Sequence, residues 1–175
     1  MFEELRIILW PDPRLLKPSQ SVTVFDEKLK GLALRMIQLM HEARGVGLAA
    51  PQVGKNIRLF VTSHTGKPED DRIYVNPVLS EPAGEDEDEE GCLSLPLINA
   101  KIIRSDSLRM SAQDLDGNPI EELATGYIAR IWQHEFDHLN GTLLMDRMGP
   151  VDKLAAKRIL RDLRKRWDDE HPPKK

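Results

Sequence analysis

The sequence lacks features that define whole classes of protein. It holds one cysteine, which excludes an internal disulfide and makes the reducing cytoplasm the expected compartment. No apolar run approaches the roughly 20 residues that span a bilayer, and the first residues have neither the basic start nor the apolar middle of a signal peptide. Aromatic residues make up only 5% of the 175 residues, so the core must be mostly aliphatic. We expect one globular domain over 1–175, without a membrane partner.

The net charge of -4 is unevenly distributed. Residues 85–90 are six consecutive acids, so the rest of the chain carries +2. Specific nucleic-acid binding is therefore not expected. The run is interpreted either as a solvated loop or as a negative field that disfavours acidic peptides.

Hydrophobic periodicity and turn residues predict three helices and several strands. Asp26 is a candidate N-cap of a helix of about 16 residues, and Thr125 of a second helix that ends near Leu139. Strands are expected at 57–62, 73–79 (kinked at Pro77), 101–104, 107–114 and 118–123, and the third helix at about 150–169. Because strands and helices do not alternate, the fold class is predicted to be α+β.

The most informative segment is 134–138, which reads His-Glu-Phe-Asp-His. Histidines four residues apart lie on the same helix face, so both imidazoles can reach one metal ion, with Glu135 beside it as a proton carrier. The alternative is a helix with two surface histidines. The apolar residues around the motif predict a buried helix, and buried histidines need partners.

A catalytic metal wants a third protein ligand and an open position. Cys92 is a candidate upstream, although a lone cysteine is also commonly a small buried hydrophobe. The glycines of 45–52 (Gly-Val-Gly-Leu-Ala-Ala-Pro-Gln) indicate either a loop that lines a site or a helix stop followed by a turn.

Taken together, 45–52, 90–94 (Glu-Gly-Cys-Leu-Ser) and 133–138 (Gln-His-Glu-Phe-Asp-His) resemble the three signature motifs of peptide deformylases, in order and in approximate spacing. The likeness runs from about Ile8 to Arg147. It implies removal of the formyl group from the N-terminal formyl-methionine of new polypeptides. It also implies small antiparallel sheets around a central helix that carries the histidines.

The resemblance assigns roles to individual residues. It implies one divalent metal held by Cys92, His134 and His138, usually Fe(II) in this family, with Zn(II), Ni(II) or Co(II) as alternatives. Glu135 would carry the proton, and the Gln52 amide and the Leu93 backbone N–H would stabilise the oxyanion. The methionine pocket is expected to comprise Val46, Gly47, Gly91, Leu93, Tyr127, Ile131 and His134, although Tyr127 and Ile131 are equally compatible with core packing.

Several points stay open in the sequence. Segment 95–100 is more apolar than the family pattern and lacks the basic residue expected near 99, and we hypothesise that Leu97 and Ile98 favour apolar side chains after the formyl-methionine. Arg130 is expected to pair with a carboxylate or with the peptide backbone. The basic residues of the C-terminal helix form either a solvated face or a contact with ribosomal RNA.

Two rival functions follow from the same motif. One is a small metalloprotease that cleaves internal peptide bonds; Cys92 and the lack of a downstream ligand disfavour it. The other is a non-enzymatic fold that binds peptides or senses iron.

Overall fold

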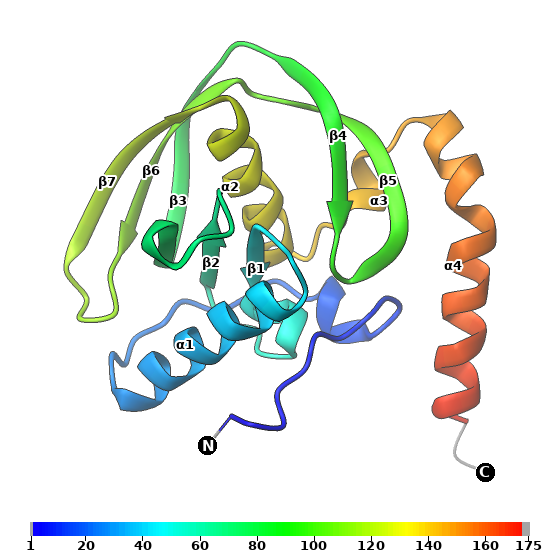
Figure 1. The fold of residues 1–175 in the computed structure, drawn as a ribbon, viewed down its shortest axis with the longest axis horizontal. Helices are drawn as coiled ribbons and strands as arrows, with labels where there is room; N and C mark the ends of the chain where they lie inside the picture. Colours follow the sequence, from blue (N-terminus) through cyan, green and yellow to red (C-terminus); the bar gives the residue numbers. More distant parts are fainter. Residues whose placement is uncertain (1, 173–175) are drawn as a thin grey trace.

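The structure, a computed structural model, describes residues 2–172, so residues 1 and 173–175 of the expected domain lie outside it. A central helix, α2, lies between a five-stranded sheet of order β1-β2-β3-β6-β7 and the two-stranded sheet β4-β5 (Figure 1). All of the strand pairs are antiparallel. The α+β prediction, with small antiparallel sheets around the motif-bearing helix, is therefore confirmed.

The chain forms four α-helices and seven strands within residues 2–172. The helices are α1 (Glu27–Glu42), α2 (Gly126–Leu139), α3 (Leu144–Arg147) and α4 (Pro150–Glu170), with short 3-10 turns at Pro13–Leu16, Ala50–Val53 and Pro68–Asp70. The strands are β1 (Gly47–Ala49), β2 (Leu59–Ser63), β3 (Asp71–Ala83), β4 (Asp86–Cys92), β5 (Leu95–Arg104), β6 (Ser107–Gln113) and β7 (Pro119–Thr125).

The helix ends agree closely with the sequence. The Asp26 carboxylate accepts hydrogen bonds from the backbone N–H groups of Lys28 and Leu29 and caps α1 as expected. Thr125 is the N-cap residue of α2, as predicted, although its side chain makes no capping hydrogen bond. Asn140 ends α2, and α4 extends one residue beyond the expected 150–169.

The acidic run corrects the expectation of a loop. Residues 86–90 belong to β4, which pairs with β5 from Asp86↔Arg104 to Gly91↔Asn99. Acids are poor strand formers, but Asp86 and Glu90 are both bound by Arg130, which offsets the unfavourable propensity. Segment 95–100 is likewise strand, the first part of β5.

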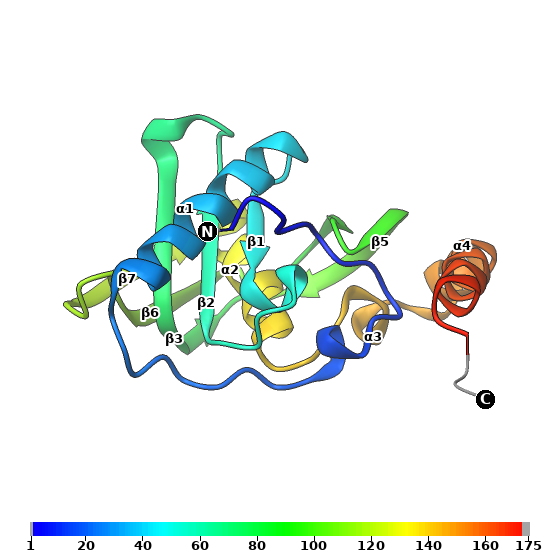
Figure 2. The same cartoon turned by 90° about the horizontal axis from the view of Figure 1, so that it is seen from below.

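Three apolar clusters hold the layers together. One joins α1 to β1 and β2, another packs α2 on the large sheet through Trp132, Phe60 and Tyr74, and the last joins β5 to α3 and α4. Seen from below, α4 lies beside the main body, flanking β5 (Figure 2). Within residues 2–172, no helix is both long and apolar enough to cross a membrane.

Candidate metal centre and substrate pocket

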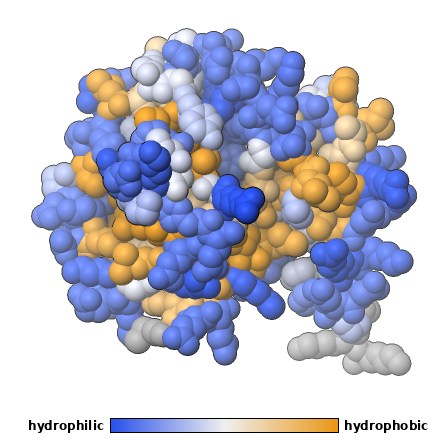
Figure 3. All heavy atoms as spheres, viewed as in Figure 1, coloured by the Kyte–Doolittle hydropathy of each residue, from blue (hydrophilic) through white to orange (hydrophobic). Residues whose placement is uncertain are grey.

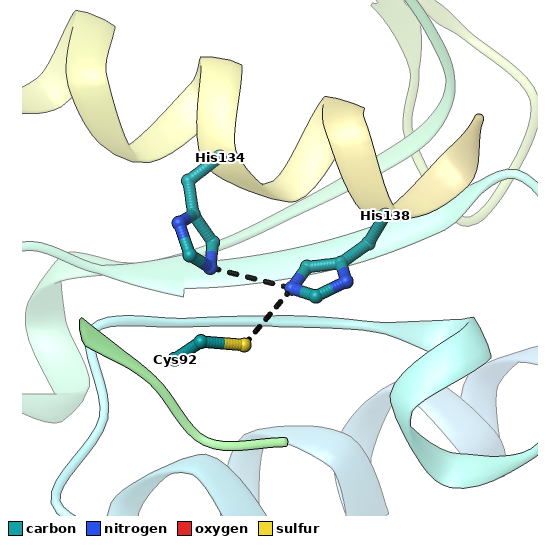
Figure 4. A group of neighbouring side chains, drawn as sticks. All are labelled: Cys92, His134 and His138. Atoms are coloured by element: carbon teal, nitrogen blue, oxygen red, sulfur yellow. Dashed lines mark hydrogen bonds between the residues drawn. The ribbon is translucent and has the colours of Figure 1, made fainter. Parts of the chain in front are cut away.

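Two histidines of α2 and the cysteine at the end of β4 converge on one point (Figure 4). The Nε2 atoms of His134 and His138 are 3.3 Å apart, and Cys92 Sγ lies 3.4 Å from His138 Nε2. The helical spacing of four places the imidazoles one above the other, and the tight turn after β4 brings the thiol to them. Three donor atoms thus lie within 4.8 Å of one another, close enough for all three to ligate one ion.

The surroundings of the histidines fit a metal. His134 Nδ1 lies 3.0 Å from Glu90 Oε2, an arrangement in which Nδ1 carries the hydrogen and Nε2 presents its lone pair. Burial, followed by the charges of His134 and Arg104, holds the pKa of His138 well below its ordinary value and favours the neutral, ligating form. Metal ligands must be deprotonated, a state that His138 already favours. Burial lowers the pKa of His134, but its hydrogen bonds with Cys92 and Glu90 outweigh burial and hold this pKa well above its ordinary value, so a bound ion would have to displace a proton from His134.

Glu90 is the centre of a buried ionic cluster. Its carboxylate accepts two hydrogen bonds from Arg104, at 2.8 and 3.0 Å, and one from Arg130 at 2.9 Å. Burial opposes its charge, but hydrogen bonds from His134 and Arg104 outweigh burial and lower the pKa of Glu90 to about 2. Arg104 also donates to Asp137 at 2.6 Å, which ties β5 to α2.

The cluster decides the open question about Arg130. Its guanidinium is buried and binds the carboxylates of Glu90 and Asp86 and the backbone carbonyls of Ile102 and Asp86. Carboxylate pairing is therefore confirmed. Sequence reasoning missed Arg104 and Asp137. The available signs were the charge of Arg104 directly after two isoleucines and the charge of Asp137 inside the motif 134–138.

Glu135 lies beside the donors and is 4% exposed. Burial raises the pKa of Glu135 to about 7, and its Oε2 atom is buried without a hydrogen-bond partner among the described residues. The backbone of Gly47 approaches it so closely that a Cβ there would overlap Glu135 Oε1. A carboxyl that titrates near neutrality is suited to taking up and releasing a proton at cellular pH.

Gln52 approaches the centre from the 3-10 turn Ala50–Val53. Its Oε1 accepts a hydrogen bond from the Ala49 backbone N–H at 2.9 Å, which fixes the amide. The Nε2 group then donates to Ser94 Oγ at 3.2 Å and lies 3.7 Å from Cys92 Sγ. Leu93 lies between these two partners in the turn that joins β4 to β5. The structure thus brings both expected oxyanion donors next to Cys92.

A cavity of about 460 Å³ opens beside these groups. All the residues expected in the methionine pocket line it: Val46, Gly47, Gly91, Leu93, Tyr127, Ile131 and His134. Ile131 is 5% exposed and serves the core and the pocket wall together, whereas Tyr127 is 53% exposed and lies at the mouth. Core packing is therefore excluded for Tyr127.

Of the two residues in the hypothesis about peptide preference, only Leu97 is exposed to a bound peptide at the cavity mouth. Ile98 is 3% exposed and belongs to the apolar cluster of β5, α3 and α4, so it forms part of the inner wall of the cavity.

Comparison with known proteins agrees with the resemblance of the three sequence motifs. Residues 4–154 match the model of the family described as polypeptide deformylase. The chain belongs to this family. A peptide deformylase from Thermotoga neapolitana is 44% identical over 161 residues, which cover 91% of this chain and 96% of the relative. A peptide deformylase structure from Plasmodium falciparum superimposes with a TM-score of 0.93 at 38% identity, covering 96% of this chain and all of that one. The structure from Thermotoga maritima gives 0.80 at 44% identity, over 83% of this chain and 98% of the other.

The family assignment settles the type of protein. Peptide deformylases are metal-dependent enzymes that remove the formyl group from N-terminal formyl-methionine, in the N-terminal processing of proteins. The chain is therefore an enzyme of this family. The internal-bond protease and the non-enzymatic binding protein lose their support, since the relatives named above are deformylases.

Proposed function

We propose that Cys92, His134 and His138 hold one divalent ion, with Fe(II) first and Zn(II), Ni(II) or Co(II) as alternatives. A thiolate with two imidazoles suits each of these borderline ions. The convergence of the three donor atoms within 4.8 Å is the single observation that carries this proposal. An ion bound there would lower the pKa of its water and so supply hydroxide near neutral pH.

Glu135 is the proposed proton carrier. Its raised pKa lets it take the proton of the attacking water and later deliver that proton to the leaving amine. Glu90 is a proposed positioning residue for His134, because its carboxylate orients the His134 ring.

The Gln52 amide and the Leu93 backbone N–H are the proposed oxyanion donors. Gln52 is 1% exposed and its oxygen is held by Ala49, so the amide is already oriented before substrate arrives. Preorganised donors are the most effective kind, and the loss of one typically costs about 10²–10³ in rate.

The cavity is the proposed binding site for the methionine side chain of N-formylmethionyl nascent peptides. Gly47 and Ile131 form its inner wall with Val46, and Gly91 and Tyr127 lie at its mouth. The absence of a side chain at each glycine leaves room for a peptide to approach the backbone.

A contact with ribosomal RNA is proposed for the outer face of α4. Lys157, Arg161 and Lys165 are exposed and four residues apart, so they form one basic stripe. The face of α4 that is visible in Figure 3 is mostly hydrophilic. Near the start of the helix, the apolar side chains of Val151 and Leu154 are exposed. Such a contact and a reduced Cys92 both fit the cytoplasm, which is the proposed compartment.

Formate release tests the proposed chemistry. Protein purified anaerobically with Fe(II) should release formate from formyl-Met-Ala-Ser and release nothing from acetyl-Met-Ala-Ser, the matched control. No formate from protein that holds metal stoichiometrically would contradict the proposal.

Co-sedimentation tests the basic stripe. Replacing its three cations by glutamate should weaken binding to ribosomes and reduce its salt dependence, because each lost phosphate contact releases fewer counterions on binding. Unchanged binding would contradict the contact. The control carries the same charge change at exposed lysines elsewhere, namely Lys17, Lys55 and Lys67.

A further inference from the structure

Leu97 is the most exposed of the large apolar side chains, at 87%, and it lies beside the catalytic cavity. Its φ is +65°, in the left-handed region that residues other than glycine, asparagine and aspartate rarely adopt. A strained backbone and an exposed leucine together are unfavourable for the folded chain alone. Such a combination at the edge of an active site is a reason to seek a function for it.

The strand register explains how the side chain comes to point outward. Gly91 pairs with Asn99 in the β4-β5 ladder, whereas Cys92 pairs with Leu95. Residues 96–98 are therefore extra on β5 and form a bulge. Within this bulge Ile98 is directed into the core and Leu97 away from it.

The cavity has an inner part and a mouth. The inner walls include buried residues such as Gln52, Ile131 and Glu135. The exposed lining residues at the mouth are Arg44, Glu89, Gly91, Leu97, Asn99 and Tyr127. A peptide whose formyl-methionine occupies the inner part must leave across this mouth with its next residue.

We propose that Leu97 provides an apolar contact for the side chain of the residue that directly follows the formyl-methionine. This deformylase then favours peptides with a large apolar second residue. The inference rests on the proposed function and extends it to a determinant of substrate preference. Covering one exposed leucine with an apolar side chain removes apolar surface from water on both partners.

Competing peptides test the inference. The measured quantity is the ratio of kcat/KM for formyl-Met-Leu-Ser to that for formyl-Met-Ala-Ser. The wild type should prefer the leucine peptide about tenfold, the low end of what apolar contacts contribute to discrimination. Leu97→Gly and Leu97→Asn should bring the ratio close to one, since both residues accept φ of +65° and neither offers a comparable apolar surface.

A matched control is available on the large sheet. Leu123 is 70% exposed on β7 and is not among the residues that line the cavity. Leu123→Asn removes a similar exposed apolar surface and should keep the wild-type ratio.

The outcomes separate the two proposals. A wild type that releases formate equally from both peptides, or Leu97 variants that keep the wild-type ratio, would overturn the role of Leu97 alone. No formate from either peptide would overturn the proposed function and this inference with it.

Discussion

Glu90 shows how one carboxylate can serve structure and chemistry together. It is 7% exposed, binds two arginines and orients His134, so its charge is compensated on every side. A buried charge cluster is costly to break because the remaining partners stay buried without compensation.

We expect Glu90→Gln to weaken metal binding by about 10- to 100-fold, the usual cost of losing a partner behind a metal-binding histidine. Stability should fall by about 3–5 kcal/mol as Arg104 and Arg130 lose their common anion. Chelator competition and chemical denaturation measure the two effects. Glu89→Gln, at the exposed neighbouring position, is the control. Wild-type metal affinity in Glu90→Gln would contradict the account.

Gly47 is a second residue with a testable role. Its Cβ would overlap the carboxylate of Glu135, so Gly47→Ala must displace the proposed proton carrier. We expect kcat to fall by about 10²-fold, because small displacements of a catalytic group cost about this much, while bound metal stays stoichiometric. Gly149→Ala meets no atom within 4 Å and should keep wild-type kcat. An active Gly47→Ala enzyme would show that Glu135 tolerates displacement.

At the residue scale, the sequence predicts the proposed metal ligands better than the residues that hold these ligands in place. Spacing alone places His134 and His138 on one helix face, because the period of a helix is fixed. Arg104 and Asp137 were missed because their pairing joins β5 to α2 across the packed fold. A contact of this kind has no fixed spacing in the sequence.

At the scale of elements, β4 shows where local propensity fails. Its acids favour a loop, yet they form a strand, in which Arg130 of α2 binds Asp86 and Glu90 and Arg104 of β5 binds Glu90. Tertiary contacts of this kind override strand propensity. In contrast, α1 and α2 were predictable, since long periodic stripes and turn residues act locally.

The 3-10 turn Pro13–Leu16 offers a pH test. Asp12 is 3% exposed; burial opposes its charge, but the hydrogen bonds and charge of Arg14 outweigh burial and lower the pKa of Asp12 below its ordinary value. An acid with a lowered folded-state pKa adds stability above its unfolded-state pKa and loses it as the pH falls through the folded-state value.

We therefore expect Asp12→Asn to cost about 1 kcal/mol at pH 7, because asparagine keeps the capping oxygen but loses the charge that binds the half-exposed Arg14. This difference from wild type should shrink below about pH 4, where Asp12 protonates in the unfolded state. Denaturation at several pH values measures it. A difference that stays constant down to pH 2 would contradict the assigned ion pair.

At the scale of the whole molecule, the donor set joins two parts of the fold. Cys92 ends β4, whereas both histidines lie on α2, so a shared ion would clamp the small sheet to the central helix. The α+β class was predictable from element order, but which strands form the smaller sheet was not, because the β4-β5 hairpin contains the acidic segment that was expected to be a loop.

Metal removal should consequently destabilise the folded chain. At a free metal concentration of 100 times Kd, binding adds about 2.7 kcal/mol, and removal should lower Tm by roughly 5–10 °C for a chain of this size. Thermal unfolding with and without chelator measures this change, and His138→Ala should show no response. A wild-type Tm that is unaffected by proven metal loss would contradict the clamp.

The most direct test of the central claim compares wild type with Glu135→Gln, both loaded with Fe(II) under anaerobic conditions. Formate release from formyl-Met-Ala-Ser and bound metal are measured on the same samples. We predict equal metal content and a rate that is lower by about 10²–10⁴ in the variant, the usual contribution of a positioned acid–base group. A variant that holds its metal and releases formate as fast as wild type would contradict the account.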